Sequence, residues 1–536
     1  MAEEAMMSEV PATLVDVLLA GRDRPGKLCF AFFPDGETEV EQQIDYDEFV
    51  ARALRIATGL RAVGIASGAH VGLVARPRVE YVLMLAAIWF NGGVAVPMNH
   101  LFKRRELIAY MTSGAVTAVF VDETTAPLIA EIAPDVPGLG VLISTCPVDG
   151  FSSVLLADLE RSEPAVTERP HREATAVLMH TSGTTGLPKA VVRTHGTYAD
   201  FAVLWARFCM RDTDRIFSFM PMYHQAGLLV HWLPAYLLGL PFFQIERFSP
   251  APFWDVVRRY ELTTGLFMPP VPTFLLATPE SPDEPGPIEW AFAVSPPDVW
   301  RAFQERFRIP MHGGYGSTET TMVGMSGGRA DGRYSDEDLD LPLGGSVMGK
   351  PLPDWCEMRI ADAGENVVPP LTFGEVQVRG PGVLKEYYNN PAATKAAFTR
   401  DGWFKSGDVG YYTDDGRFVH VDRTKNLIRR SGENIAPAEI EEVLMEHPGV
   451  AEVAVVPVED EIRGQEIRAC VVPAPGSEIT AADVFALCAA ELSAFKVPRY
   501  VEFLDSLPHT PTFKIQKDQL IGASDRSRWV DRLATA

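Results

Sequence analysis

One ten-residue segment constrains what this chain can fold into more than any other. Residues 180–189 read HTSGTTGLPK, and they continue the short apolar run Ala176–His180. Glycines in such a segment allow a tight turn and a close approach of the backbone to a ligand. Free N–H groups and hydroxyls can then converge on phosphate oxygens, and a lysine adds a positive charge. We therefore predict a buried strand that ends in a phosphate-binding loop formed by Thr181, Ser182, Gly183, Thr184, Thr185, Gly186 and Lys189.

This loop differs from a Walker A loop. Lys189 stands between Pro188 and Ala190, whereas that motif requires glycine before the lysine and serine or threonine after it. The five residues SGTTG alone would fit a flexible surface turn equally well. The full ten-residue string behind an apolar strand favours the binding loop.

The composition narrows the classes of protein further. The chain has 536 residues, of which 47% are apolar and 22% charged, so it can form several domains with buried cores. Its net charge of −23 repels a phosphate backbone, and we expect no nucleic acid among its partners. Six widely spaced cysteines and a start without a basic and apolar leader favour a reducing compartment, the cytoplasm.

Two apolar runs invite comparison with membrane spans. Tyr81–Phe90 stops after ten residues, and Gly227–Phe243 is interrupted by His231, Pro234 and Pro241. A span needs about 20 consecutive apolar residues. We predict that both runs are buried core helices and that the chain has no integral membrane association.

Helical and extended patterns alternate through the first 320 residues or so. Tyr81–Phe90 is followed by Val94–Met98, and Glu106–Ser113 by Ala115–Val121. Such alternation predicts parallel sheets covered by helices. Short strands with Asp-Gly turns then predict a β-rich segment, and a compact α/β pattern restarts after Asp422. We predict two domains, residues 1–421 and 422–536.

The loop at residues 180–189 resembles the ATP-phosphate loop of the adenylate-forming superfamily. This superfamily comprises acyl-CoA synthetases, adenylation domains of peptide synthetases and firefly-type luciferases. The resemblance runs from about residue 45 to residue 520. It implies an α/β fold with a large N-terminal domain, made of two layered α/β subdomains and a distorted β-barrel, and a small mobile C-terminal α/β domain.

Residues 314–320, GYGSTET, resemble the second signature of the superfamily. An aromatic ring between two glycines can stack on a flat base, and the implied adenine site comprises Gly314, Tyr315 and Gly316. Thr318 offers a hydroxyl to the α-phosphate. Glu319 offers a hard oxygen, which suits Mg²⁺.

Three segments resemble the ribose and hinge motifs. In WFKSGD, Asp408 matches the carboxylate that accepts both ribose hydroxyls. In DRTKN, residues 422–426, Arg423 also reaches the ribose and Lys425 is the pivot between the domains. In RRSGENI, Gly432 belongs to the loop that lines the thiol tunnel after the C-terminal domain rotates.

Two further motifs complete the resemblance. LPHTPTFKIQK, residues 507–517, makes Lys514 the catalytic lysine, whose ammonium would bridge the attacking carboxylate and the α-phosphate. In FMPMYH, His224 matches the histidine that borders the carboxylate and gates the thiol channel. There are two departures. Phe513 stands where the superfamily has glycine or asparagine, and Ala291–Val294 replaces Gly-Gly-Ala-Pro beside the adenine, with Ala293 in the place of the alanine.

The implied function is an AMP-forming ligase that uses ATP, Mg²⁺ and coenzyme A. It would activate a small-molecule carboxylic acid to an acyl-adenylate, release pyrophosphate and pass the acyl group to coenzyme A. The hinge and terminal motifs are most similar to the fatty-acyl and crotonobetaine/carnitine-CoA ligase branch. The motifs name no particular acid and no oligomeric state.

Alternative functions remain open at this point. The two departures are compatible with another acceptor, a carrier-protein thiol or an amine, including a diazotase that activates nitrite to diazotise an aryl amine. A nucleotide-binding pseudoenzyme is disfavoured because Lys514 and Glu319 are both present. The motifs do not separate these from a luciferase-like oxygenase.

Overall fold

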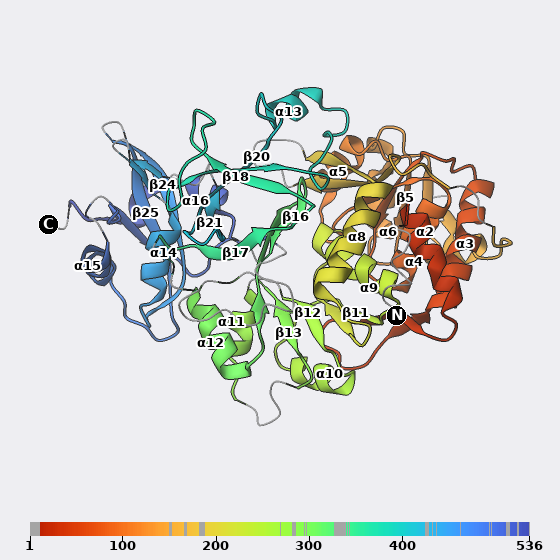
Figure 1. The fold of residues 1–536 in the computed structure, drawn as a ribbon, viewed down its shortest axis with the longest axis horizontal. Coiled ribbons are helices and arrows are strands. Elements are labelled where there is room, and N and C mark those ends of the chain that lie inside the picture. Colours follow the sequence, from red (N-terminus) through yellow and green to blue (C-terminus); the bar gives the residue numbers. More distant parts are fainter. Residues whose placement is uncertain are drawn as a thin grey trace.

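The computed structural model describes residues 11–148, 153–165, 169–181, 188–267, 270–280, 286–293, 295, 297–325, 339, 341, 343–423, 428–430, 433–435, 437–460, 463–492, 494, 496–510, 515–522 and 525–534. These residues form four sheets flanked by helices (Figure 1). Three sheets belong to a large N-terminal domain, and the fourth belongs to a smaller C-terminal α/β domain. The predicted fold class is confirmed.

Two seven-stranded sheets dominate the N-terminal domain, and each is parallel except for one edge strand. The first has the order β7-β6-β5-β3-β4-β8-β9, with β9 antiparallel. Its strands are β3 His70–Val74, β4 Val94–Pro97, β5 Ala118–Val121, β6 Val141–Ser144, β7 Ser153–Leu155, β8 Thr175–Thr181 and β9 Lys189–Thr194. The second has the order β14-β13-β12-β10-β11-β1-β2, with β2 antiparallel. Its strands are β1 Leu28–Phe33, β2 Gln42–Asp45, β10 Ile216–Ser218, β11 Phe242–Ile245, β12 Thr264–Leu266, β13 Trp290–Phe292 and β14 Met311–His312.

Helices cover both sheets and also lie between them. The α-helices of the N-terminal domain are α2 Leu14–Leu19, α3 Tyr46–Ala62, α4 Val79–Phe90, α5 Arg104–Ser113, α6 Ala126–Ile132, α7 Leu156–Leu159, α8 His195–Cys209, α9 Leu233–Leu238, α10 Phe253–Arg259, α11 Pro270–Leu276, α12 Pro297–Phe307 and α13 Pro391–Ala396. Helix α4 contacts β1 and β2 of one sheet and β3 and β4 of the other. Its residues are buried all round apart from Glu80. A helix enclosed by protein on every side is apolar on every side, which accounts for the run Tyr81–Phe90.

The second apolar run differs from its prediction. A single helix over Gly227–Phe243 is wrong, because the helical part comprises a π-helical segment, Ala226–Trp232, and α9, which ends at Leu238. Gly239 follows with a φ of 70°, the left-handed conformation that commonly terminates a helix. After Pro241 the chain enters β11 as a buried strand. Among the described residues, no helix is both long and apolar enough to cross a membrane.

The third sheet is antiparallel and has the order β15-β16-β17-β21-β20-β19-β18. Its strands are β15 Gly314–Ser317, β16 Thr321–Met325, β17 Ser346–Pro351, β18 Glu357–Ala361, β19 Gly374–Arg379, β20 Phe404–Tyr412 and β21 Phe418–Arg423. It is the β-rich segment for which a distorted barrel is expected, and its described strands pair in one open path. In Figure 1 it lies between the N-terminal layers and the C-terminal domain.

The C-terminal domain has one mixed sheet, β23-β22-β25-β26-β27, with β24 paired to β25. Its strands are β22 Ile428–Arg430, β23 Glu433–Ile435, β24 Val450–Asp460, β25 Gly464–Pro473, β26 Tyr500–Phe503 and β27 Trp529–Asp531, and its helices are α14 Pro437–Met445, α15 Ala481–Glu491 and α16 Lys517–Ile521. Ala438 of α14 packs against the cluster that Tyr411, Val419 and Val421 form on the third sheet. The two domains therefore share an apolar contact at β21.

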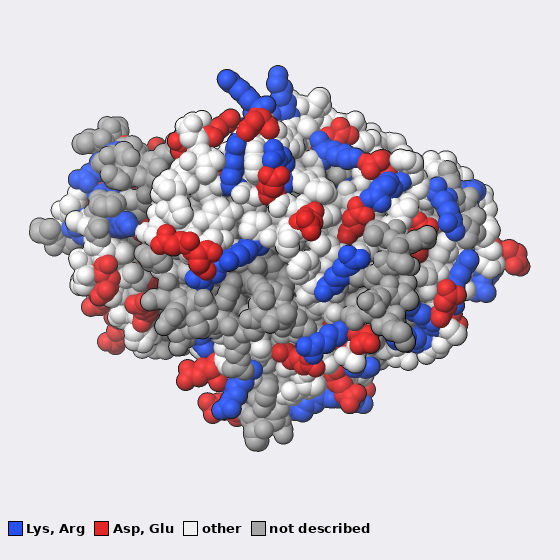
Figure 2. Space-filling view, in the orientation of Figure 1, with Lys and Arg blue, Asp and Glu red and all other residues white. Residues whose placement is uncertain are grey.

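Charged side chains of both signs are interspersed on the face drawn in Figure 2. On the described part of this face, neither sign forms a continuous patch. Some charged side chains of the described residues are paired across elements, as in Arg104 with Glu131 and Arg359 with Asp401. Pairs this exposed contribute little to stability.

His231 makes the stability of the fold sensitive to acid. The side chain is 3% exposed in the π-helical segment, and its Nδ1 atom has no hydrogen-bond partner among the described residues. Burial lowers the pKa of His231 to about 3. Because the unfolded chain takes up this proton near pH 6.5 and the folded chain does not, stability falls as the pH drops below 6.5.

The wild type is expected to lose free energy of unfolding when the pH falls from 7 to 5. In His231→Leu we expect this loss to be smaller by about 2 kcal/mol. Urea unfolding at the two pH values measures this difference. His171→Leu, at an exposed position, is the matched control and should show the wild-type pH dependence. A His231→Leu variant that loses as much stability as the wild type would contradict the assignment.

Candidate active site

The predicted phosphate loop connects two antiparallel strands. Thr181 at the end of β8 is the register partner of Lys189 at the start of β9. Thr181 and Lys189 are thus held opposite each other at the mouth of the loop. Ser182, Gly183, Thr184, Thr185 and Gly186 lie outside the described residues. The chain continues as a strand, and α8 begins only at His195, which sets this arrangement apart from the loop-to-helix geometry of a Walker A motif.

The predicted adenine and ribose residues lie together on the third sheet. The hydroxyl of Tyr315 donates a 2.7 Å hydrogen bond to Oδ2 of Asp408. The Tyr315 ring stacks near His420, with a centroid distance of 6.1 Å and an interplanar angle of 27°. Asp408 and Arg423 are register partners on β20 and β21. The structure thus brings three residues from distant sequence motifs into one neighbourhood.

Glycine is required at Gly316. A Cβ atom there would stand 2.1 Å from the carbonyl oxygen of Thr321. At Gly314, a Cβ atom would stand 2.7 Å from the ring of Phe292. This close approach lets β15 pack tightly on β16 and on the end of β13, which holds Tyr315 in place between the two glycines.

Glu319 and Thr318 follow β15 at its carboxyl end. The Glu319 side chain is half-buried, and its Oε1 accepts a 3.0 Å hydrogen bond from the hydroxyl of Tyr387. The buried guanidinium of Arg193, on β9, donates to the carbonyl oxygen of Thr318 and, at 2.8 Å, to that of Gly382. This half-buried carboxylate, with one fixed hydrogen bond, is the kind of hard oxygen ligand that Mg²⁺ accepts.

The predicted metal ligand therefore fits the magnesium ion that accompanies ATP. Among the described residues no group of three or more His, Cys, Asp or Glu side chains is placed to hold a metal ion. A single protein carboxylate suits Mg²⁺ that arrives bound to phosphates, because this ion keeps several waters and takes few protein ligands.

His224 lies on the turn after β10. The side chain is exposed, and its Nδ1 accepts a 3.2 Å hydrogen bond from the N–H of Ala226. The neutral ring therefore carries its proton on Nε2, which can act as a donor. The next residue, Gln225, donates from Nε2 to the carbonyl oxygen of Ser317 at 2.8 Å. This bond fixes the His224 turn beside the strand that leads to Thr318 and Glu319.

The departure at Ala291–Val294 has a structural counterpart. Ala293 is buried, and its N–H donates to the carbonyl oxygen of His312 at 2.9 Å. The ring of Phe292 packs edge-on against Trp205, with centroids 5.7 Å apart, and reaches the position under Gly314. An aromatic ring thus occupies space that glycine at this position would leave empty.

Several predicted residues remain expectations. Lys425, Gly432, Phe513, Lys514 and Val294 lie outside the described residues. Arg423 is placed by its backbone register on β21. The domain boundary near Asp422 also remains a proposal.

Sequence reasoning missed three residues that the structure places at the site: Arg193, Gln225 and Tyr387. Arg193 offered a weak signal, since an arginine interrupts the apolar pattern of a strand. Gln225 directly follows the predicted His224. No sequence pattern points to Tyr387, because it follows Glu319 by 68 positions and only the tertiary fold places the two side chains in contact.

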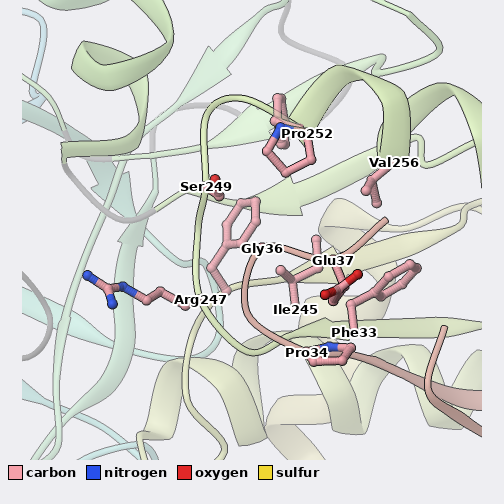
Figure 3. A pocket seen from close by; sticks show the side chains of 11 residues that line it. Phe33, Pro34, Gly36, Glu37, Ile245, Arg247, Ser249, Pro252 and Val256 are labelled. Carbon is pink, nitrogen blue, oxygen red and sulfur yellow. The ribbon is translucent and has the colours of Figure 1, made fainter. Parts of the chain in front are cut away.

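A small pocket lies at the ends of β1 and β11 and beside α10 (Figure 3). Phe33, Ile245 and Val256 form its apolar wall, and Arg247 extends away from this wall. Phe219, the first residue of the FMPMYH segment, is the link between this pocket and the His224 turn. Its lining includes none of Lys189, Tyr315, Glu319 and Asp408, and we assign it no ligand.

Layered parallel sheets, an antiparallel third sheet and a small C-terminal α/β domain match the architecture that the motif resemblance implies for ATP-dependent, AMP-forming ligases. A family model described as an AMP-binding enzyme matches residues 20–388, and a model described as the C-terminal domain of AMP-binding enzymes matches residues 439–514. The chain belongs to the AMP-binding enzyme family.

Its relatives act as CoA ligases. A crotonobetaine/carnitine–CoA ligase of Proteus mirabilis is 32% identical over 89% of this chain and 93% of the relative. A sulfoacetate–CoA ligase of Cupriavidus necator is 32% identical over 86% and 88%, and an oxalate–CoA ligase of Arabidopsis thaliana is 33% identical over 85% and 88%.

Solved structures agree with this assignment. ATP-bound MatB of Rhodopseudomonas palustris is similar with a TM-score of 0.82 and 28% identity, covering 95% of this chain and 98% of that one. O-succinylbenzoate CoA synthetase of Bacillus subtilis, in complex with ATP and magnesium, is similar with a TM-score of 0.79 and 27% identity, covering 94% and 98%.

Proposed function

We propose that this protein activates a small carboxylic acid with Mg-ATP and transfers the acyl group to coenzyme A. The single observation that carries the proposal is the meeting of Tyr315, Asp408 and Arg423 on one sheet. Lys189 and Glu319 add to it, since both contact the side chain of Tyr387. These residues come from separate motifs. Their convergence supports one nucleotide site with an adenosine end and a phosphate end.

Two displacements make up the reaction. A carboxylate oxygen attacks the α-phosphorus of ATP, the bond from this phosphorus to the bridging oxygen breaks, and pyrophosphate leaves. The sulfur of coenzyme A then attacks the acyl carbon of the adenylate, AMP leaves, and the thiol proton passes to solvent or to a base. AMP, pyrophosphate and the thioester are the products.

Each predicted site residue would have its own role in this reaction. Tyr315, with Gly314, Gly316 and Ala293, would hold the adenine, and Asp408 and Arg423 the ribose. The loop from Thr181 to Lys189 would hold the β- and γ-phosphates, Thr318 the α-phosphate, and Glu319 the magnesium ion. Lys514 would stabilise charge in the first step only. Binding and orientation of this kind contribute most of the catalysis expected in phosphoryl chemistry.

We also propose that the C-terminal domain rotates about Lys425 between the two steps. Rotation would move Lys514 out of the active site and bring the loop at Gly432 to the thiol tunnel, so that one site serves two reactions. The packing of Ala438 against the cluster of Tyr411, Val419 and Val421 is a small apolar contact that such a motion would break or replace.

The acid is proposed to be short and polar. The relatives named above act on crotonobetaine or carnitine, sulfoacetate and oxalate. The ring of Phe292 lies under Gly314 and is backed by Trp205, and this filled space supports a compact acid. A reducing compartment suits six free cysteines, and we place the enzyme in the cytoplasm.

The test is release of AMP and pyrophosphate from Mg-ATP across a panel of short polar, aryl and fatty acids and nitrite, with and without coenzyme A. We expect AMP release that requires one short polar acid together with coenzyme A. Glu319→Ala is the matched control, because it should require more Mg²⁺ and so distinguishes this activity from contaminating ATPases. Release that ignores coenzyme A, or that occurs only with nitrite or an added amine, would contradict the proposal.

A further inference from the structure

Tyr387 connects the two ends of the predicted phosphate site. It lies on a segment between β19 and α13 that runs along the edge strand β9. The N–H of Tyr388 donates to the carbonyl oxygen of Ala190 at 2.7 Å, and an isolated bridge pairs Tyr387 with Val191. This pairing carries Tyr387 to the strand that begins with Lys189.

The side chain makes two polar contacts with predicted site residues. Its hydroxyl donates to Oε1 of Glu319 at 3.0 Å, and the Nζ atom of Lys189 lies 5.1 Å from the centroid of its ring. An ammonium at this distance is attracted to the face of the ring. One tyrosine thus contacts both the predicted metal ligand and the predicted phosphate lysine.

The surroundings of Tyr387 hold it in place. The residue is 6% exposed and packs against Val191, Leu384 and Phe404. Its backbone N–H donates to the hydroxyl of Thr394 at 3.0 Å. The ring is thereby held so that its hydroxyl points at the Glu319 carboxylate.

We infer that Tyr387 is a positioning residue for Mg-ATP. Its hydroxyl fixes the orientation of the Glu319 carboxylate, and its ring keeps the Lys189 ammonium beside the phosphates. A partner that orients a metal ligand commonly changes metal affinity or activity by about 10- to 100-fold when it is removed. The inference rests on the proposed function, because it assumes that Glu319 meets the magnesium ion of ATP.

Tyr387→Phe separates the two contacts, because it removes the hydroxyl and keeps the ring. The first measurement is binding of Mn²⁺ with a non-hydrolysable ATP analogue, followed through the loss of the free Mn²⁺ electron paramagnetic resonance signal. We expect affinity to fall about tenfold or more. The Mg²⁺ concentration for half-maximal pyrophosphate release should rise in parallel, and thioester formation from a preformed adenylate should stay at the wild-type rate.

Tyr388→Phe is the matched control, since its ring lies against His70 and away from Glu319. It should bind Mn²⁺ and the analogue like the wild type. Unchanged Mn²⁺ affinity in Tyr387→Phe, or equal loss in both half-reactions, would overturn the inference. A wild-type protein that neither binds the Mn²⁺ complex nor releases pyrophosphate would instead overturn the proposed function.

A double-mutant cycle decides the case if Tyr387→Phe also lowers the melting temperature. Glu319→Gln removes the charge that the Tyr387 hydroxyl contacts. Positioning through this bond predicts that the two changes together weaken Mn²⁺ binding by much less than the product of their separate effects. Independent, multiplying effects would show that Tyr387 acts only through packing.

Discussion

Lys514→Ala is expected to slow acyl-adenylate formation by about 100- to 1,000-fold while thioester formation from a preformed adenylate stays near the wild-type rate. The ammonium would stabilise negative charge only while the carboxylate attacks the α-phosphorus. An interaction made only in one transition state affects only the step that passes through it. Single-turnover assays of pyrophosphate release and of thioester formation measure the two steps separately.

Lys395→Ala is the matched control for this experiment. Lys395 is an exposed lysine on α13, and its removal should change neither half-reaction. An equal loss in both half-reactions of Lys514→Ala would contradict the proposed rotation, because the lysine would then serve both steps. A wild-type rate of adenylate formation would remove Lys514 from the site.

Lys517→Met is expected to lower the free energy of unfolding of the C-terminal domain by about 3–5 kcal/mol. The Nζ atom of Lys517 lies 3.1 Å from Oδ2 of Asp422, at the end of β21, and 2.9 Å from Oε1 of Glu441 on α14. Burial opposes the charge of Lys517, but the two carboxylates outweigh it and raise the pKa of Lys517. Without the ammonium, two carboxylates would face each other in a largely buried site, which is the costly case for a broken ion pair.

Urea unfolding followed by limited proteolysis measures this loss and locates it in the chain. Lys385→Met is the matched control, since Lys385 pairs with Glu173 on an exposed surface and its loss should cost less than about 1 kcal/mol. Equal stabilities of the two variants would show that Asp422 and Glu441 need no cation. Because Asp422 lies near the end of β21, three residues before the predicted pivot Lys425, the same variant tests whether this cluster holds the domain orientation.

Local pattern was enough to predict many elements. The apolar run Ala176–His180 predicted a strand and is the core of β8, and the pattern Glu106–Ser113 predicted a helix and lies within α5. Both follow from periodicity and from flanking glycine or proline. The run Gly227–Phe243 failed, because apolar content alone does not distinguish a helix from a buried strand, and Gly239 ends the helix inside the run.

The candidate site likewise combines residues that the sequence predicts with contacts that it does not predict. The resemblance of their motifs to the adenylate-forming superfamily predicted Tyr315, Asp408, Glu319 and Lys189, and each carries a side chain whose chemistry suits one part of a nucleotide. That Tyr315 and Asp408 share a hydrogen bond could not be read from the chain, because 93 positions separate them and β-sheet register decides the contact. Gln225 and Arg193 were missed for the same reason, since their functional contacts are with backbone carbonyl groups of distant strands.

The sequence by itself determined the class of the protein, the order of its motifs and the chemistry of the residues in them, because these depend on residue identity and on spacing along the chain. Tertiary structure alone decided how Tyr387 reaches both Glu319 and Lys189, and how Lys517 joins Asp422 to Glu441. These contacts depend on which strands become neighbours and in which register. Strand order and register depend on the burial of apolar side chains over the whole core, and no local segment of the chain determines them.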